Sequence, residues 1–291
     1  MLILPNSTPL NAEPFAQRVA QLATQALLDE ARLTPKPGLV DGRGCGAHDD
    51  LDLALMERSA NSLRETFFQL ALCSLQRYPD VSLRIDIGRI GRVGEQVMLD
   101  VTHGVNTHRG AIWALGLLVS AFAMHAGHVR DPNLLTQTAA RLARIDDPMQ
   151  PQRFSKGKKV CQRYRIPGAR EQAQLGFPTV IDYGLNQLWS SRICGADEDS
   201  ARLDALLAMM QVLTDTCVLS RGGIDALKTM QAGARAVLNA GGCGCSAGRI
   251  QLSKLDCTLL ELYVSPGGSA DLLSATLLLD WFKSEPVINP F

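Results

Sequence analysis

The feature of this sequence that most constrains its fold is a helical hydrophobic period. Apolar side chains recur every three or four positions, as at Val19, Leu22, Ala23, Ala26 and Leu27, and again at Leu203, Leu206, Leu207, Met210 and Leu213. This spacing places them on one face of an α-helix. The alternation typical of a strand is best developed over 81–87, which is short. The sequence therefore predicts an all-α fold, with a single helical domain over 1–291 containing about ten helices.

Glycine- and proline-rich breaks separate the helical stretches, and we expect them to form functional loops. They cover 34–46, 103–110, 146–168, 221–223, 241–248 and 265–268.

Two apolar segments are predicted to be buried helices. The run 111–124 is shorter than the ~20 residues that span a bilayer, and 272–281 is apolar on nearly all sides, as expected for a central helix. The chain begins with only three consecutive apolar residues, 2–4, and no basic residue precedes them, so no secretory signal is expected. These observations favour a cytoplasmic protein without a membrane partner.

Composition excludes several classes of protein. The chain has 29 Lys and Arg and 29 Asp and Glu, which argues against a nucleic-acid or anionic-membrane binder. A hydrophobic content of 46% excludes a disordered scaffold. The eight cysteines are expected to be reduced thiols. Cys243 with Cys245, and His125 with His128, lack the second paired half that a zinc site needs.

The first motif whose side chains could take part in chemistry is TPKPGLVD (34–41), which is followed by GAHDDLD (46–52). It presents Lys36, Asp41, His48, Asp49 and Asp52. If a helix starts near Asp49, then Asp49 and Asp52 share a face and suit Mg²⁺. The alternative is that an aspartate caps the helix.

A second motif, GVNTHRG (104–110), leads into the apolar run. Thr107 is a candidate cap, and Asn106, His108 and Arg109 would stand at the positive end of a buried helix, which attracts anions. A structural role for the histidine is the alternative.

Two further motifs are individually weak. SPGGSAD (265–271) has two glycines before an apolar helix, so its backbone could approach a phosphate. Asp215 and Arg221 precede a second glycine pair at 222–223. The alternative for this segment is that it forms the C-cap of a helix. The stretch 153–170 holds seven basic residues, including Arg170, and no acid before Glu171. It is either a solvated loop or a phosphate clamp.

Together these motifs resemble the triphosphoribosyl-dephospho-CoA synthase family over about 31–282. TPKPGLVD, GAHxDxD, GVNTHRG, GFP, RGG and SPGGSADLL occur in the family's order. The forms GRGCGAHDDLD and THRGAIW are more similar to the malonate decarboxylase branch than to the citrate lyase branch.

The resemblance implies a glycosyl transfer. ATP and 3′-dephospho-CoA would give 2′-(5″-triphosphoribosyl)-3′-dephospho-CoA and free adenine, the prosthetic-group precursor of an acyl carrier subunit. The 2′-hydroxyl attacks C1 of the ATP ribose, and the transition state has oxocarbenium character that a carboxylate would stabilise.

This chemistry suggests roles for the motif residues. Mg²⁺ is the expected cofactor, at Asp49 and Asp52. His48, His108, Asp41 and Asp215 are the catalytic candidates. Substrate and phosphate binding is assigned to Lys36, Asn106, Arg109, Arg170, Arg221, Ser265, Gly267, Gly268, Ser269 and Asp271.

Other functions remain open at this point. They are the same reaction serving citrate lyase, phosphoryl transfer from ATP, a non-catalytic chaperone of the carrier subunit, and nucleic-acid binding through 153–170. The last lacks interleaved aromatics beyond Phe154 and Tyr164. Exposed apolar helix faces would allow a homodimer.

Overall fold

A computed structural model describes residues 11–150 and 156–286. It confirms the all-α fold. Within these ranges there is no β-strand, and an isolated bridge joins Asp41 to Gly44. The elements are α1 (Ala12–Arg32), α2 (Leu53–Ser62), α3 (Arg64–Ser74), α4 (Val81–Val101), α5 (Arg109–Met124), α6 (Pro132–Arg144), α7 (Lys156–Tyr164), α8 (Ala169–Gln174), π-helix η1 (Thr179–Leu185), α9 (Asn186–Ile193), α10 (Glu198–Met210), α11 (Thr216–Asn239), α12 (Ser246–Glu261) and α13 (Gly267–Ser284).

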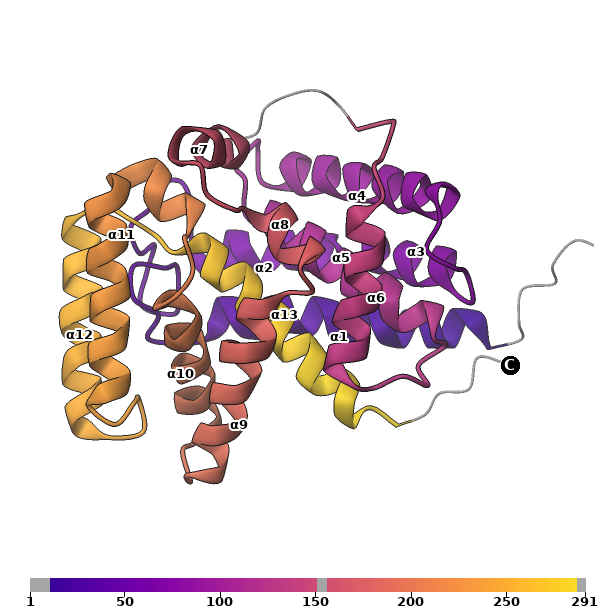
Figure 1. The fold of residues 1–291 in the computed structure, drawn as a ribbon. Helices are drawn as coiled ribbons and strands as arrows, with labels where there is room; N and C mark the ends of the chain where they lie inside the picture. Colours follow the sequence, from indigo (N-terminus) through magenta and orange to yellow (C-terminus); the bar gives the residue numbers. More distant parts are fainter. Residues whose placement is uncertain (1–10, 151–155, 287–291) are drawn as a thin grey trace, which may run out of the picture.

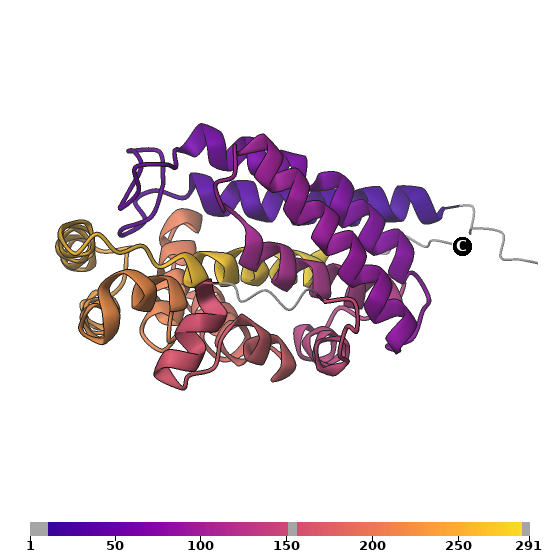
Figure 2. The same cartoon turned by 90° about the horizontal axis from the view of Figure 1, so that it is seen from above.

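Helix α13 runs through the middle of the molecule (Figure 1). Viewed from above, it lies between a layer of helices from the N-terminal part of the chain and a layer from the C-terminal half (Figure 2). It packs against α1 and α5 on one side and against η1 and α10 on the other. Eleven of its residues are buried, because an apolar helix gains most free energy where every face is covered. The predicted central helix is confirmed.

Helix α5 is the second buried helix, and it confirms the prediction for 111–124. Every residue from Leu115 to Ala123 is buried. Helices α1, α5 and α13 pack against one another. The first turns of α5 and α13 meet at Gly110 and Asp271, and the charge of Glu30, in the last turn of α1, acts on Asp271.

The structure refines several local features of this prediction. The segment 81–87, where strand-like alternation was best developed, is the start of α4, and Asp80 caps that helix by accepting from Leu83 N at 2.7 Å. The helices outnumber the ten or so expected, and one of the additional ones, α7, lies inside the predicted break 146–168. The predicted break at 221–223 is present as a kink within α11, at Gly223 with φ of 69°.

None of the helices in the described ranges is both long and apolar enough to cross a membrane.

Candidate functional site

Asp215 joins the beginnings of two helices. It is the N-cap of α11, where Oδ1 accepts from Cys217 N at 2.9 Å. Its Oδ2 accepts from Ser269 N at 2.8 Å and from Ser269 Oγ at 3.1 Å, in the first turn of α13. Asp215 therefore begins a helix, and the C-cap alternative does not apply to it. Asp215 is 1% exposed, and burial raises its pKa against the effect of these hydrogen bonds.

Asp271 lies next to the start of a third helix, α5. This half-buried residue near the start of α13 lies against Gly110, in the first turn of α5, where the neighbouring backbone N–H of Ala111 favours its ionised form. Burial, then the negative charges of Glu30 and Asp215, raise its pKa well above the usual range. Three helix N-termini, each partially positive, thus converge on two neighbouring carboxylates.

Lys36 is the cation of this cluster and is 1% exposed. Its Nζ donates to Glu30 Oε1 at 2.5 Å and to the Glu30 carbonyl at 2.6 Å, at the end of α1. Glu30 was not predicted. It falls on the apolar face of its helix, three residues after Leu27, and a buried-face acid is the signal that could have found it.

His108 lies beside this cluster. It is 2% exposed, its Nδ1 lies 2.8 Å from Ser59 Oγ, and its buried Nε2 has no hydrogen-bond partner among the described residues. Burial, together with the charge of Lys36, lowers its pKa to about 3, so the imidazole is neutral at neutral pH. Thr107 does not cap α5; its hydroxyl pairs with Ser59 Oγ at 2.6 Å.

Glycines let the carboxylates approach the backbone. A Cβ at position 110 would overlap Asp271 Oδ2, and one at position 268 would lie 3.1 Å from Asp215 Oδ2. At position 267 it would lie 3.2 Å from Cys217 Sγ. The glycine pair expected to cradle a phosphate therefore packs against the Asp215–Cys217 turn. Ser265, just before it, is 2% exposed and its Oγ has no partner in the described residues.

Asp41 anchors the 34–46 loop. It accepts from Lys36 N at 2.8 Å and from the Arg43 guanidinium at 2.8 Å. Arg43 also donates to Asp256 Oδ2 at 2.6 Å, and Asp256 accepts a second hydrogen bond from Gly38 N at 2.9 Å. These bonds hold the loop against α12, and with it Lys36.

Arg221, His48 and Asp49 meet in an outer group. Arg221 donates to the Ala47 carbonyl at 2.5 Å and lies 3.0 Å from His48 Nδ1. Its guanidinium stacks over the Tyr263 ring at 5.7 Å, and the Tyr263 hydroxyl hydrogen-bonds Asp49. Burial, then the charge of Arg221, lowers the pKa of His48.

The remaining candidates have other partners. Asp52 caps α2 through Leu55 N at 2.6 Å, and α2 begins at Leu53, so the expected shared helix face with Asp49 does not exist. Arg109 pairs with Glu95 at 2.5 Å. Asn106 accepts from Arg109 N at 3.2 Å, and Arg170 pairs with Asp146 at 2.7 Å.

Part of the basic stretch 153–170, helix α7, lies along α11. A Cβ at Gly157 in α7 would be 3.6 Å from Thr216 Oγ1, and one at Gly223 would be 3.6 Å from the Tyr164 hydroxyl. Helix α7 therefore runs from the Asp215 cap to the Gly223 kink, with Lys159 and Arg163 exposed. Arg153 and Phe154 lie outside the described residues.

The cysteines of the Gly-Cys-Gly-Cys turn have structural contacts. Cys245 caps α12, accepting from Gly248 N at 3.4 Å, and Cys243 N donates to the buried Asp204 at 2.7 Å.

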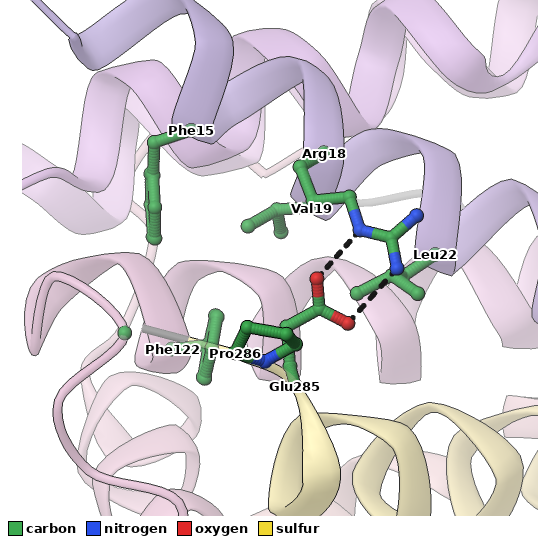
Figure 3. Close-up of a pocket in the computed structure, with 8 residues that line it drawn as sticks. Phe15, Arg18, Val19, Leu22, Phe122, Glu285 and Pro286 are labelled. Carbon is green, nitrogen blue, oxygen red and sulfur yellow. Dashed lines mark hydrogen bonds and ion pairs between the residues drawn. The ribbon is translucent and has the colours of Figure 1, made fainter. Parts of the chain in front are cut away.

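A small pocket lies away from all these groups (Figure 3). It is lined by Phe15 near the start of α1, Phe122 near the end of α5 and Glu285 after α13, the opposite ends of the helices that form the cluster. The Arg18–Glu285 ion pair, at 2.6 Å, lies in its wall. None of the cluster residues lines this pocket, so the pocket does not form part of the candidate substrate site.

Comparison with known proteins agrees with the motifs. Residues 16–288 match the family model described as ATP:dephospho-CoA triphosphoribosyl transferase. A 2-(5″-triphosphoribosyl)-3′-dephosphocoenzyme-A synthase of Klebsiella pneumoniae is 56% identical over 275 residues, covering 94% of this chain and 98% of the relative. A probable synthase of the same name from Stutzerimonas stutzeri (strain A1501) is 57% identical over 271 residues, covering 92% and 93%. No solved structure matches. With a family model and close relatives spanning nearly its whole length, this chain belongs to the ATP:dephospho-CoA triphosphoribosyl transferase family.

Proposed function

We propose that this chain transfers the triphosphoribosyl group of ATP to the 2′-hydroxyl of 3′-dephospho-CoA, releases adenine, and serves a malonate decarboxylase. Membership of the transferase family and the names of its relatives support the reaction. The observation that carries the proposal is the group of three acids, buried Glu30 and Asp215 with half-buried Asp271, in which Lys36 pairs with Glu30.

The charge of this cluster suits glycosyl transfer. As adenine leaves, positive charge develops at C1 and the ring oxygen of the ribose, and buried carboxylates stabilise such charge strongly. Phosphoryl transfer instead places negative charge on the moving group and gathers cations around it. Asp215, which the backbone N–H groups of Cys217 and Ser269 hold in place, is suited to the former, and Asp271 adds a second acid in the first turns of α13.

The reaction also moves a proton. The attacking 2′-hydroxyl loses one, and adenine gains one as its bond to C1 breaks. His108 has a free ring nitrogen beside the cluster, so it is our candidate acceptor. Because burial and the charge of Lys36 lower its pKa in the free protein, this role requires the negative charge of the bound substrates to raise that pKa again. In the free protein His48 is already engaged with Arg221, which gives it a positioning role at the rim.

The polyphosphate chains need cations outside the acidic centre. Exposed Lys159 and Arg163 on α7, and Arg221 on α11, flank the turn that begins at Asp215. Lysine and arginine pair with phosphate by charge and, for arginine, by a bidentate fork. Mg²⁺ is expected to accompany the triphosphate, where it would neutralise phosphate charge.

Product analysis tests the reaction. The protein is incubated with ATP, Mg²⁺ and 3′-dephospho-CoA, and the products are separated by chromatography and identified by mass. Free adenine with a triphosphoribosyl adduct is expected. ADP or AMP would indicate phosphoryl or adenylyl transfer instead, and carrier-subunit binding without turnover would indicate a chaperone.

The malonate decarboxylase assignment rests on GRGCGAHDDLD and THRGAIW. Since both branches make the same product, a gene deletion separates them. Loss of the prosthetic group from the malonate decarboxylase carrier subunit is expected, and its loss only from citrate lyase would contradict the assignment.

A further inference from the structure

A second charged group lies beside the N-terminal half of α5, which packs against both α4 and α8 (Figure 1). Arg84 and Arg92 belong to α4, and Asp147 follows α6. Arg92 Nη1 donates to Asp147 Oδ2 at 2.6 Å, while Arg84 Nη1 lies 3.8 Å from the same oxygen. Two guanidinium groups therefore share one carboxylate.

Gly88 makes room for this group on α4. A Cβ at position 88 would overlap Asp147 Oδ2, and it would lie 3.0 Å from Arg84 Nη1 and 3.1 Å from Arg92 Nη1. Positions 84, 88 and 92 are four residues apart, so they lie on one face of the helix. Because position 88 carries no side chain, the two guanidinium groups and the carboxylate meet against the helix backbone.

Arg84 is buried, yet its guanidinium lacks hydrogen-bond partners. The residue is 6% exposed, and its buried Nε has no partner among the described residues. The 3.8 Å to Asp147 is too long for a hydrogen bond, and that carboxylate already accepts from Arg92 and from Met149 N. The Arg84 guanidinium also lies over the Trp113 ring at 5.3 Å, a contact that satisfies the charge in part but no N–H group.

The surroundings of Arg84 carry more positive than negative charge. Asp146 pairs with Arg170, in the first turn of α8, at 2.7 Å. That turn lies next to Trp113, whose Nε1 donates to the Ala169 carbonyl at 3.2 Å. Three arginines, two on α4 and one on α8, thus surround two aspartates. Within residues 11–150 and 156–286, Arg84 is the member of this group without a carboxylate of its own.

A buried cation in this state is unfavourable. Burial lowers the pKa of Arg84, and the charge of Arg170 acts in the same direction. An arginine nevertheless stays charged at neutral pH, so the folded protein holds a desolvated charge with unmade hydrogen bonds. A methionine would fill much of the same space without that penalty. Buried groups of this kind are expected where a ligand of opposite charge completes their hydrogen bonds.

An anion can reach this group from solvent. The side chains of Arg92 and Arg170 are 32% and 46% exposed, respectively. The planar fork of arginine matches two oxygens of a phosphate, and a phosphate accepts several such forks at once. The chemistry of the group therefore fits a phosphorylated ligand.

We propose that Arg84, with Arg92 and Arg170, binds the phosphate groups of a nucleotide substrate. This rests on the proposed function, in which two polyphosphate chains are bound together: the triphosphate of ATP and the diphosphate of 3′-dephospho-CoA. The cations of α7 and α11 lie on the Asp215 side of the acidic group. Trp113 lies about one turn of α5 beyond Gly110, which contacts Asp271. The Arg84 group thus supplies a second set of cations, near Asp271, for the second polyphosphate chain.

The binding of each nucleotide alone tests this site. The full chain is titrated in a calorimeter with ATP and Mg²⁺, and separately with 3′-dephospho-CoA. Arg84→Met and Arg170→Gln are expected to weaken the binding of the same nucleotide about tenfold or more. A loss confined to ATP assigns the triphosphate to the site, and a loss confined to 3′-dephospho-CoA assigns the diphosphate. Arg89→Met, at an exposed position of the same helix, is the matched control and should bind both nucleotides as the unmodified chain does.

Thermal unfolding separates a ligand site from a structural ion pair. Without nucleotide, Arg84→Met should melt no lower than the unmodified chain, because it removes a buried charge and its sulfur still contacts the Trp113 ring. The bound nucleotide should raise the melting temperature of the unmodified chain more than that of Arg84→Met. If Arg84 were a structural cation, Arg84→Met would melt lower without nucleotide.

Two results would overturn the proposal: unchanged binding of both nucleotides in Arg84→Met or Arg170→Gln, or a lower melting temperature of nucleotide-free Arg84→Met. Either result can occur in a protein that releases adenine, so the phosphate site can fail while the proposed reaction stands. Conversely, nucleotide binding that depends on Arg84 in a protein that releases ADP would keep the site and reject the reaction.

Discussion

At the scale of single residues, burial decides the chemistry of His108. The imidazole has lost its water, its Nδ1 faces a serine hydroxyl, and Lys36 lies close enough to repel a second positive charge. Its pKa falls to about 3, far below the usual value for histidine. Burial and the charge of Lys36 therefore oppose protonation of the ring in the free protein.

This predicts an acid-sensitive contribution to stability. Because the folded-state pKa lies below the unfolded one, the contribution is present above pH ~6.5 and is lost as pH falls toward ~3. His108→Gln should remove it, so the unmodified chain should lose about 2 kcal/mol relative to the variant between pH 6.5 and pH 5. Urea titrations at several pH values measure this.

The exposed His128 supplies the control for that experiment. His128→Gln should follow the unmodified chain at every pH. Parallel pH profiles for all three proteins would show that His108 is not held neutral.

At the scale of elements, the site depends on how close the first turns of several helices lie to one another. Asp271 on α13 reaches the first turn of α5 because position 110 carries no side chain. Gly268, which was expected to let the backbone approach a phosphate, likewise makes space for a carboxylate, that of Asp215.

Gly110→Ala is therefore expected to be harmful. The added methyl would overlap Asp271 Oδ2, and the clash should cost about 1–3 kcal/mol of stability while displacing the carboxylate and lowering adenine release. Denaturant melts and the adenine assay measure the two effects.

Gly91→Ala is the matched substitution within α4. A Cβ there meets nothing within 4 Å, so stability should rise by about 0.5–1 kcal/mol with activity unchanged. Equal effects of the two substitutions would contradict the role given to Gly110.

At the scale of the whole molecule, α13 connects the charged cluster to the hydrophobic core. Its first turn holds Ser269 and Asp271, and its last turn carries Phe282, which is fully buried and stacks on Phe122 with centroids 3.9 Å apart. The same helix thus carries the site at one end and core packing at the other.

Phe282→Ala should destabilise the protein by about 3–5 kcal/mol, because it removes a large buried side chain and leaves a cavity. Well below the melting temperature, turnover should be unchanged, since the substitution lies at the opposite end of α13. Thermal melts and adenine release at low temperature measure both. Loss of turnover in fully folded protein would show that the two ends are coupled.

The sequence by itself determined the helical fold, the buried helices and the membership of most cluster residues. Periodicity and apolar runs are local properties, and they survive folding because a helix closes its backbone hydrogen bonds within one segment. Lys36, His108, Asp215 and Asp271 were predicted from motifs and do come together in the structure.

Only the tertiary structure decided which candidates share the site. Asp52 and Asp41 were predicted from motifs, as Asp271 was, yet Asp52 caps α2 and Asp41 anchors a loop. Glu30 was missed because an acid within an amphipathic helix has no motif. Proximity between α1, α5, α11 and α13 arises from packing over long sequence separations, and it is this packing that turns separate carboxylates into one buried, charge-unbalanced cluster.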